Sequence, residues 1–187
     1  MQLGIAQGIL FATQTLGAGT VQAQIQDTPM VGGQAMYPTR DIVDNAVNSA
    51  DHTTLVAAVK AAGLVETLKG PGPFTVFAPT NAAFSLLPDG TVETLLQPAN
   101  KEALTSVLTY HVVSGGYDAK ALMDLIKKGG GKATLTTVNG QTLTLMMNGT
   151  RNVVVKDAKG DVANISIYDV YQKNGVILVV DRVLLPA

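Results

Sequence analysis

The sequence contains no cysteine, few charged residues and only two histidines, His52 and His111. The absence of cysteine excludes disulfides, thiolate nucleophiles and zinc sites built on cysteine. Charged residues make up 14% of the chain, compared with about 25% in ordinary soluble proteins. We therefore expect a polar but weakly charged surface, and any imidazole chemistry would have to use one of the two histidines.

Basic residues are not clustered, since the longest run is Lys127-Lys128 and the formal net charge is -1. Proteins that bind nucleic acid or anionic lipid through phosphates present clustered Lys and Arg. We therefore expect no nucleic-acid partner. The length of 187 residues suits one globular domain with an additional segment.

The N-terminal segment, residues 1–23, is uncharged and rich in apolar residues. Residues 21–23 have the small-x-small pattern of a signal-peptidase site, although no Lys or Arg precedes the apolar run as in an ordinary export signal. Two alternatives stay open: a cleaved export signal, or a retained helix that packs in an oligomer or a membrane complex. Membrane contact is expected only if the segment is retained. A helix here would place small residues on one face: Gly4, Gly8 and Ala12.

Residues 24–38 carry Pro and Gly without a hydrophobic period, which predicts a linker or extended arm, and the folded domain is predicted over residues 39–187. Apolar residues at helical spacing, bounded by capping residues, dominate the first part of this domain. The predicted helices cover residues 40–48, 52–62, 81–87, 92–96, 101–111 and 119–128.

One early strand is predicted among the helices, and the hydrophobic period changes to two after residue 133. Asn139-Gly140 predicts a type I′ hairpin turn, in which both central residues have positive φ. Helices followed by a run of antiparallel strands indicate the α+β class. The predicted strands cover residues 74–78, 134–138, 141–147, 151–156, 162–171 and 176–181.

His111 continues the apolar stripe of residues 104–108, so we expect a partly buried ring at a helix C-terminus, where free carbonyls accept its N–H and the helix dipole favours its charge. Ser106 is outside the spacing of helical neighbours, and neither histidine has a second ligand at metal-binding spacing. We therefore expect no catalytic, metal-binding or cofactor-binding residue. Tyr110 lies off the stripe and is expected to present its hydroxyl at the surface.

Three stretches, Phe74 to Phe84 (FTVFAPTNAAF), Tyr110-His111 and Asn174 to Pro186 (NGVILVVDRVLLP), resemble the motif series of the fasciclin-type adhesion domain. The resemblance covers roughly residues 39–187 and extends to small single-domain secreted bacterial members. It implies a wedge of antiparallel β-strands with several short helices packed alongside. It also implies a secreted, periplasmic or cell-surface module that binds a protein or matrix partner without catalysis.

The same resemblance makes Tyr110 and His111 a candidate partner-binding or structural motif, because this region of animal relatives is implicated in integrin binding. The family usually has His where this chain has Leu178, so a pairing between two motif histidines is absent here. The other motif positions are expected to be mainly structural: Phe74, Phe77, Pro79, Thr80, Asn81, Phe84, Asn174, Gly175 and Asp181.

Three hypotheses about function remain from the sequence. The first is the secreted interaction module, and the second is an assembly subunit that retains residues 1–23 as a packing helix. The third is an enzyme or small-molecule binder that uses His111. The sequence leaves the formation of a homo-oligomer open.

Overall fold

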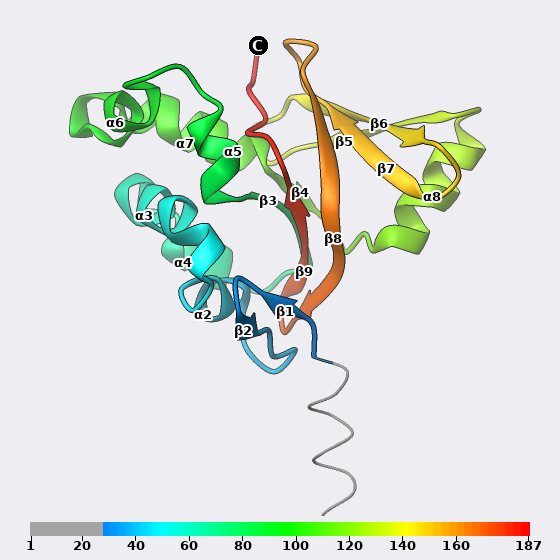
Figure 1. Cartoon of the computed structure of the whole chain (residues 1–187), viewed down its shortest axis with the longest axis horizontal. Coiled ribbons are helices and arrows are strands. Elements are labelled where there is room, and N and C mark those ends of the chain that lie inside the picture. The colour runs from blue at the N-terminus through cyan, green and yellow to red at the C-terminus, as the bar shows by residue number, and fades with distance from the viewer. Residues whose placement is uncertain (1–27) are drawn as a thin grey trace, which may run out of the picture.

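The structure is a computed structural model that describes residues 28–187 (Figure 1). The predictions for residues 1–23, whether cleaved signal or retained helix, lie outside the described residues. Among the described residues, no helix has the length and apolar character needed to cross a membrane.

The helices are short, and capping side chains decide where several of them begin. α2 starts at Ile42, later than predicted, because Asp41 is the N-cap residue and its carboxylate accepts the Asp44 N–H at 2.8 Å. α8 begins where the sequence predicted, because Asp118 accepts the Ala121 N–H at 2.8 Å. The helices are α2 (Ile42–Ala46), η1 (Ala50–His52), α3 (Thr53–Ala62), α4 (Val65–Lys69), α5 (Asn81–Ser85), α6 (Thr91–Leu96), η2 (Pro98–Asn100), α7 (Lys101–Tyr110) and α8 (Ala119–Lys128).

Within residues 28–187 the main sheet has seven strands in the order β4-β3-β9-β8-β7-β6-β5. All neighbouring pairs are antiparallel except β3 and β9, which run parallel, so the sheet is mixed and the α+β class is confirmed. Val113 bridges to Thr137, which brings the chain after β5 back to β4. The strands are β1 (Met30–Val31), β2 (Gln34–Ala35), β3 (Phe74–Pro79), β4 (Val112–Ser114), β5 (Lys132–Thr136), β6 (Thr142–Asn148), β7 (Asn152–Lys156), β8 (Val162–Gln172) and β9 (Gly175–Val180).

The turn between β5 and β6 contains Asn139-Gly140 but is not of type I′. Only Gly140 has positive φ, at 90°, whereas type I′ requires positive φ at both central residues. The Asn139 side chain accepts the Gln141 N–H at 2.9 Å and closes a wider turn. The predicted hairpin therefore forms with a different turn, because this side-chain bond replaces the left-handed conformation of Asn139.

Part of the predicted arm belongs to the packed body of the domain. β1 and β2 form a small hairpin, and Val31 in β1 and Met36 directly after β2 are buried at 3% and 2% exposure. The Gly32 carbonyl accepts the Ala50 N–H at 3.3 Å, which attaches the hairpin to the start of η1. The hairpin thus covers one end of the helical side of the sheet (Figure 1).

Buried apolar side chains of residues 28–187 form two cores on opposite faces of the sheet. Alternation along β9 shows this directly, since Ile177 and Val179 belong to one core and Leu178 and Val180 to the other. We call the first the helix-side core, because α2–α7 cover it, and the second the strand-side core, which β5–β7 and α8 enclose (Figure 1).

Candidate functional site

Tyr110 lies at the end of α7 and is completely buried in the strand-side core. Its hydroxyl donates to the Thr142 carbonyl and accepts the Ala158 N–H, both at 2.9 Å. Burial raises the pKa of this phenol. The prediction that the hydroxyl faces solvent is wrong, because the last turn of α7 lies between the two cores, and the side off its apolar stripe faces the strand-side core.

His111 follows on the opposite side and lines the helix-side core at 2% exposure. Its Nδ1 lies 2.7 Å from the Val107 carbonyl, which can only accept, and its Nε2 lies 2.9 Å from the Leu184 N–H, which can only donate. The ring is therefore neutral with its hydrogen on Nδ1.

Burial lowers the pKa of His111 to about 4, against weaker opposing effects of the Val107 carbonyl and the Asp157 carboxylate. The predicted hydrogen bond to a helix carbonyl is present. The helix dipole was expected to favour a charged ring, but burial keeps the ring neutral. Both ring nitrogens are occupied by backbone partners, so His111 has no nitrogen free to transfer a proton.

Thr80 and Asn81, which follow β3, cap two different helices. The Thr80 hydroxyl accepts the Ala83 N–H at 3.2 Å and begins α5, which decides between the two caps, Thr80 and Asn81, that the sequence left open. The Asn81 side chain instead accepts the Thr54 N–H at 3.0 Å and donates to the Ala50 carbonyl at 2.9 Å. Asn81 thus provides the cap that α3 lacks locally and ties that helix to the end of β3.

Asn174 makes a similar connection at the other end of the sheet. Its side-chain oxygen accepts the Ile42 N–H at 3.1 Å, and its amide donates to the carbonyls of Leu68 and Gly70 at 2.6 and 3.0 Å. One side chain therefore satisfies backbone groups at the start of α2 and at the end of α4.

The remaining motif residues also make contacts within the fold. A Cβ on Gly175 would lie 2.1 Å from the Phe74 carbonyl oxygen, so only glycine permits this approach of β9 to β3. Asp181 accepts the backbone N–H of Asn164 at 2.8 Å and its side-chain amide at 2.9 Å. The aromatic and proline positions of the first motif are buried or half-buried: Phe74, Phe77, Pro79 and Phe84.

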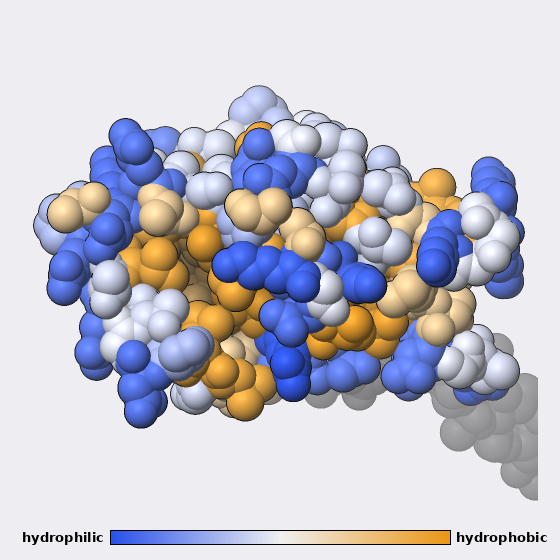
Figure 2. Space-filling model, turned by 90° about the horizontal axis from the view of Figure 1, so that it is seen from above, coloured by the Kyte–Doolittle hydropathy of each residue, from blue (hydrophilic) through white to orange (hydrophobic). Residues whose placement is uncertain are grey.

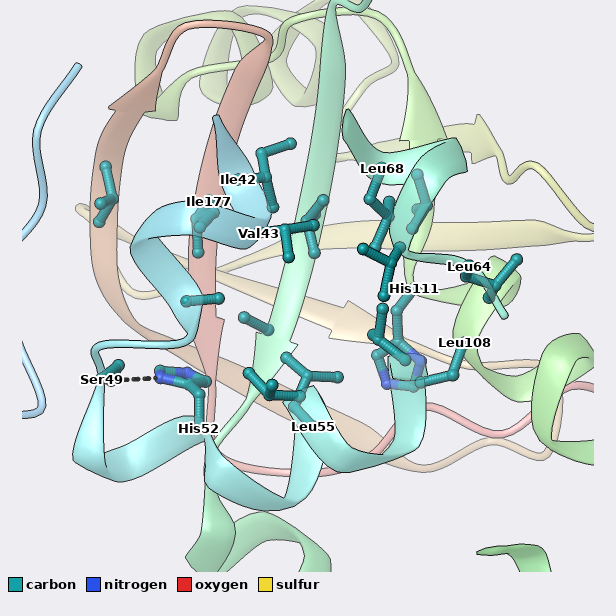
Figure 3. Close-up of a pocket in the computed structure, with 18 of the residues that line it drawn as sticks. Ile42, Val43, Ser49, His52, Leu55, Leu64, Leu68, Leu108, His111 and Ile177 are labelled. Atoms are coloured by element: carbon teal, nitrogen blue, oxygen red, sulfur yellow. Dashed lines mark hydrogen bonds between the residues drawn. The ribbon is translucent and has the colours of Figure 1, made fainter. Parts of the chain in front are cut away.

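A pocket with a cavity of about 50 Å³ lies in the helix-side core, beneath α2, α3 and α4 and against β3 and β9 (Figure 3). Its wall is almost entirely apolar, and it brings together the two histidines, which are 59 positions apart in the sequence (111 minus 52). In Figure 3, His52 and His111 lie on either side of Leu55. The apolar side chains labelled there are Ile42, Val43, Leu55, Leu64, Leu68, Leu108 and Ile177.

His52 differs from His111 in having only one bonded nitrogen. The residue is 3% exposed, and its Nδ1 lies 2.9 Å from the Ser49 hydroxyl, but Nε2 has no hydrogen-bond partner among the described residues. Burial lowers the pKa of His52, against smaller opposing effects of the Ala78 carbonyl and Asp51. The Ala78 carbonyl is near the ring without meeting hydrogen-bond geometry at Nε2.

No function was predicted for His52 from the sequence, and no local signal would have placed it in a pocket. Its surroundings come from α2, β3 and β9, which are distant in the chain. Within residues 28–187 no group of three or more His, Asp or Glu side chains is placed to hold a metal ion.

Comparisons with known proteins agree with this architecture. The family model "Fasciclin domain" matches residues 50–186. Protein sll1483 of Synechocystis sp. is 45% identical over 177 residues, which cover 91% of this chain and 89% of the relative. Cell surface glycolipoprotein MPB83 of Mycobacterium bovis is 31% identical over 180 residues, which cover 94% of this chain and 74% of the relative.

Among solved structures, the FAS1 domain pair of the insect cell adhesion molecule Fasciclin I is similar in fold, with a TM-score of 0.70 at 19% identity. The match covers 79% of this chain and 51% of that structure, so the chain spans about half the length of the domain pair. At this identity the likeness concerns the fold.

Proposed function

This chain belongs to the fasciclin domain family, and we propose that it is a non-enzymatic interaction module that acts as a secreted, periplasmic or cell-surface protein. The named relatives support the location, since one is a cell-surface glycolipoprotein of Mycobacterium bovis. The insect protein of similar fold is a cell adhesion molecule.

The observation that carries this proposal is that the residues of the family motifs make their contacts and hydrogen bonds within the fold. Tyr110 and His111 are buried and fully hydrogen-bonded, so we propose a structural role for both. Contact with a partner then falls to side chains outside the motifs. The large apolar side chains that are exposed among residues 28–187 are Met30, Tyr37, Val47, Leu86, Val138, Val162 and Tyr171.

The proposed partner is a protein or matrix component that is recognised through neutral polar and apolar contacts. Figure 2 shows one face of the molecule, on which apolar side chains reach the surface between polar ones. Because only 14% of the residues are charged, electrostatic steering contributes little to association. We expect the affinity to change less than about threefold between low and high salt.

Cross-linking on intact cells that produce this chain, followed by mass spectrometry, tests the proposal. A surface or matrix protein should be recovered, and its purified form should bind the chain with weak salt dependence. Cross-links to cytosolic proteins alone would overturn the proposal. A Tyr110→Phe variant is the matched control, because a buried residue that only supports the fold should leave the partner affinity unchanged.

For residues 1–23 we propose an export segment that is removed, on the basis of their apolar run and the small-x-small pattern at residues 21–23. The intact mass of the native protein distinguishes this from the assembly alternative. Loss of about the first 23 residues supports removal. A native mass that includes them favours a packing helix in an oligomer or membrane complex.

A further inference from the structure

Three asparagines in this chain are followed directly by glycine: Asn139, Asn148 and Asn174. A glycine has no Cβ to hinder its backbone nitrogen or to restrict its dihedral angles, so this nitrogen can reach Cγ of the preceding asparagine. Such a pair is chemically prone to lose the side-chain amide of the asparagine. The sequence alone does not rank the three pairs, because the following residue is the same in each, but the fold places them in three different environments.

We propose that Asn148 is the site at which the folded chain deamidates, whereas the fold protects Asn139 in part and Asn174 strongly. The Gly149 nitrogen attacks Cγ of Asn148 and forms a new C–N bond. The bond between Cγ and Nδ2 breaks, and ammonia leaves with the proton from Gly149. Water then opens the resulting succinimide ring at either carbonyl and gives aspartate or isoaspartate, without oxidation or reduction. This modification is independent of the partner surface proposed above.

Asn148 is the last residue of β6 and leads into the turn to β7. Its side chain is exposed and makes no hydrogen bond with the part of the chain that the structure describes. Gly149 is exposed too, with φ at 76° and no atom within 4 Å of the position that a Cβ would take. The side chain and the backbone nitrogen are therefore free to turn toward each other.

Asn139 precedes a glycine in the turn between β5 and β6, but its side chain is bound. Its oxygen accepts the Thr137 hydroxyl at 3.1 Å and the Gln141 N–H at 2.9 Å, and its amide donates to the Ser106 carbonyl at 3.2 Å. The attacking nitrogen is engaged as well, since the Gly140 N–H donates to the Thr137 carbonyl at 3.0 Å. Several of these bonds must break before the ring can form.

Asn174 is the most strongly held of the three. It is 9% exposed, and its side chain makes three hydrogen bonds, to the backbone of α2, of α4 and of the residue after α4. The backbone of Gly175 packs directly against the Phe74 carbonyl, which leaves it no room to rotate. A hydrogen bond of ordinary strength corresponds to a factor of about twofold to tenfold in rate. Three such bonds predict that Asn174 reacts at least about tenfold more slowly than Asn148.

The reaction changes the charge of the surface and the end of one strand pair. Either product adds one negative charge, which takes the formal net charge from -1 to -2. In isoaspartate the main chain runs through Cβ and Cγ and is one methylene longer at the Asn148–Asn152 pair, the last between β6 and β7. We therefore expect fraying at this end of the hairpin, while the pairs beyond it remain closed.

Incubation of the full chain at mildly alkaline pH, followed by peptide mass spectrometry, measures the three deamidation rates. In the folded chain Asn148 should react first, Asn139 at an intermediate rate, and Asn174 at least about tenfold more slowly than Asn148. In urea the differences should largely disappear. A rate at Asn139 or Asn174 that equals or exceeds that of Asn148 in the folded chain would overturn the proposal. The same ratios in urea would also overturn it, because the fold would then not be their cause.

The products and two variants identify the route and the site. Both aspartate and isoaspartate should form at position 148, whereas aspartate alone would indicate direct hydrolysis of the side chain and contradict the succinimide route. Asn148→Gln should abolish the fast reaction, because the longer side chain closes a larger ring. Asn152→Gln is the matched control, since Asn152 is exposed and lies opposite Asn148 in the same pair. Persistence of the fast reaction in Asn148→Gln, or its loss in Asn152→Gln, would refute the assignment.

Discussion

The helix-side and strand-side cores lie on opposite faces of one sheet, yet they are filled to different degrees. In the strand-side core, residues such as Leu143 and Val153 are 0% exposed. The helix-side core contains the cavity of about 50 Å³, and Leu55 and Val59 on its wall are 7% and 8% exposed.

The way each core is closed explains the difference. Continuous strand pairing from β8 to β5, together with α8, encloses the strand-side core. The helix-side core is closed by short helices, and Asn81 and Asn174 hold several of their ends in place. Short helices joined at their ends leave spaces between them that side chains do not fill completely. One face of the sheet is thus covered by continuous strand pairing, whereas the other retains a cavity of about 50 Å³.

The largest expected effect comes from removing a leucine from each core. Leu143→Ala should lower the free energy of unfolding by about 4 kcal/mol, and Leu55→Ala by about 2.5 kcal/mol, because Leu55 already borders an empty space and loses fewer contacts. Urea unfolding of both variants measures the difference. Equal losses, or a larger loss for Leu55→Ala, would mean that the two cores are equally filled.

Acid should lower the stability of the folded chain through protonation of His111, which lies between the two cores. The pKa of this ring is about 4 in the folded chain and about 6.5 when unfolded, so the unfolded chain binds more protons between these values. The stabilisation that the neutral ring gives the folded chain is fully present above about pH 6.5. The free energy of unfolding falls by about 3 kcal/mol as the pH is lowered to 4. The lowered pKa of His52 acts in the same direction.

Urea unfolding at a series of pH values compares the native chain with His111→Gln, which lacks this titration. The variant should be less stable at neutral pH and should lose less stability on acidification. If both chains show the same dependence on pH, the ring is not held neutral in the fold.

Removing the connection at Asn174 should loosen the helix-side core specifically. Asn174→Ala should cost about 2 kcal/mol, because the Ile42 N–H and the Leu68 carbonyl lose their buried partner. Asp181→Ala, whose bonds to Asn164 are exposed, should cost less than about 1 kcal/mol. Hydrogen exchange should become faster in α2 and stay slow in β7. Faster exchange in both elements would show that the two cores open together.

The smallest expected effect comes from the same substitution, Val→Ile, made once in each core. Val76→Ile in β3 adds a methylene beside the cavity and should stabilise the chain by about 0.5 kcal/mol. Val153→Ile in β7 adds the same group to a filled core and should destabilise it by about 1 kcal/mol. Thermal unfolding measures both, and two changes of the same sign would remove the contrast.

The sequence predicted features that depend on neighbouring residues and missed those that depend on distant ones. The Asp118 cap and the Gly129 stop are local, so α8 has the predicted bounds. The motif order also predicted the family, since each motif is a continuous stretch. The parallel pairing of β3 and β9 joins segments about a hundred residues apart, and no local pattern encodes it.

For the candidate site, the sequence predicted the helix-end position of His111 but not its neutral state, which comes from the Leu184 N–H. The position of Tyr110 could not be predicted either, because helical periodicity identifies one buried face and α7 ends between two cores. The unpartnered nitrogen of His52 depends on side chains from several elements, so only the folded structure shows it.

The pH titration of the two histidine rings, followed through the imidazole signals of labelled native chain, tests most directly whether the Tyr110–His111 segment is sealed between the cores. We expect His111 to remain neutral, with its hydrogen on Nδ1, at every pH well above its pKa of about 4. Titration of His111 near the ordinary histidine value of about 6.5 would contradict this, since it would require a ring that is open to water.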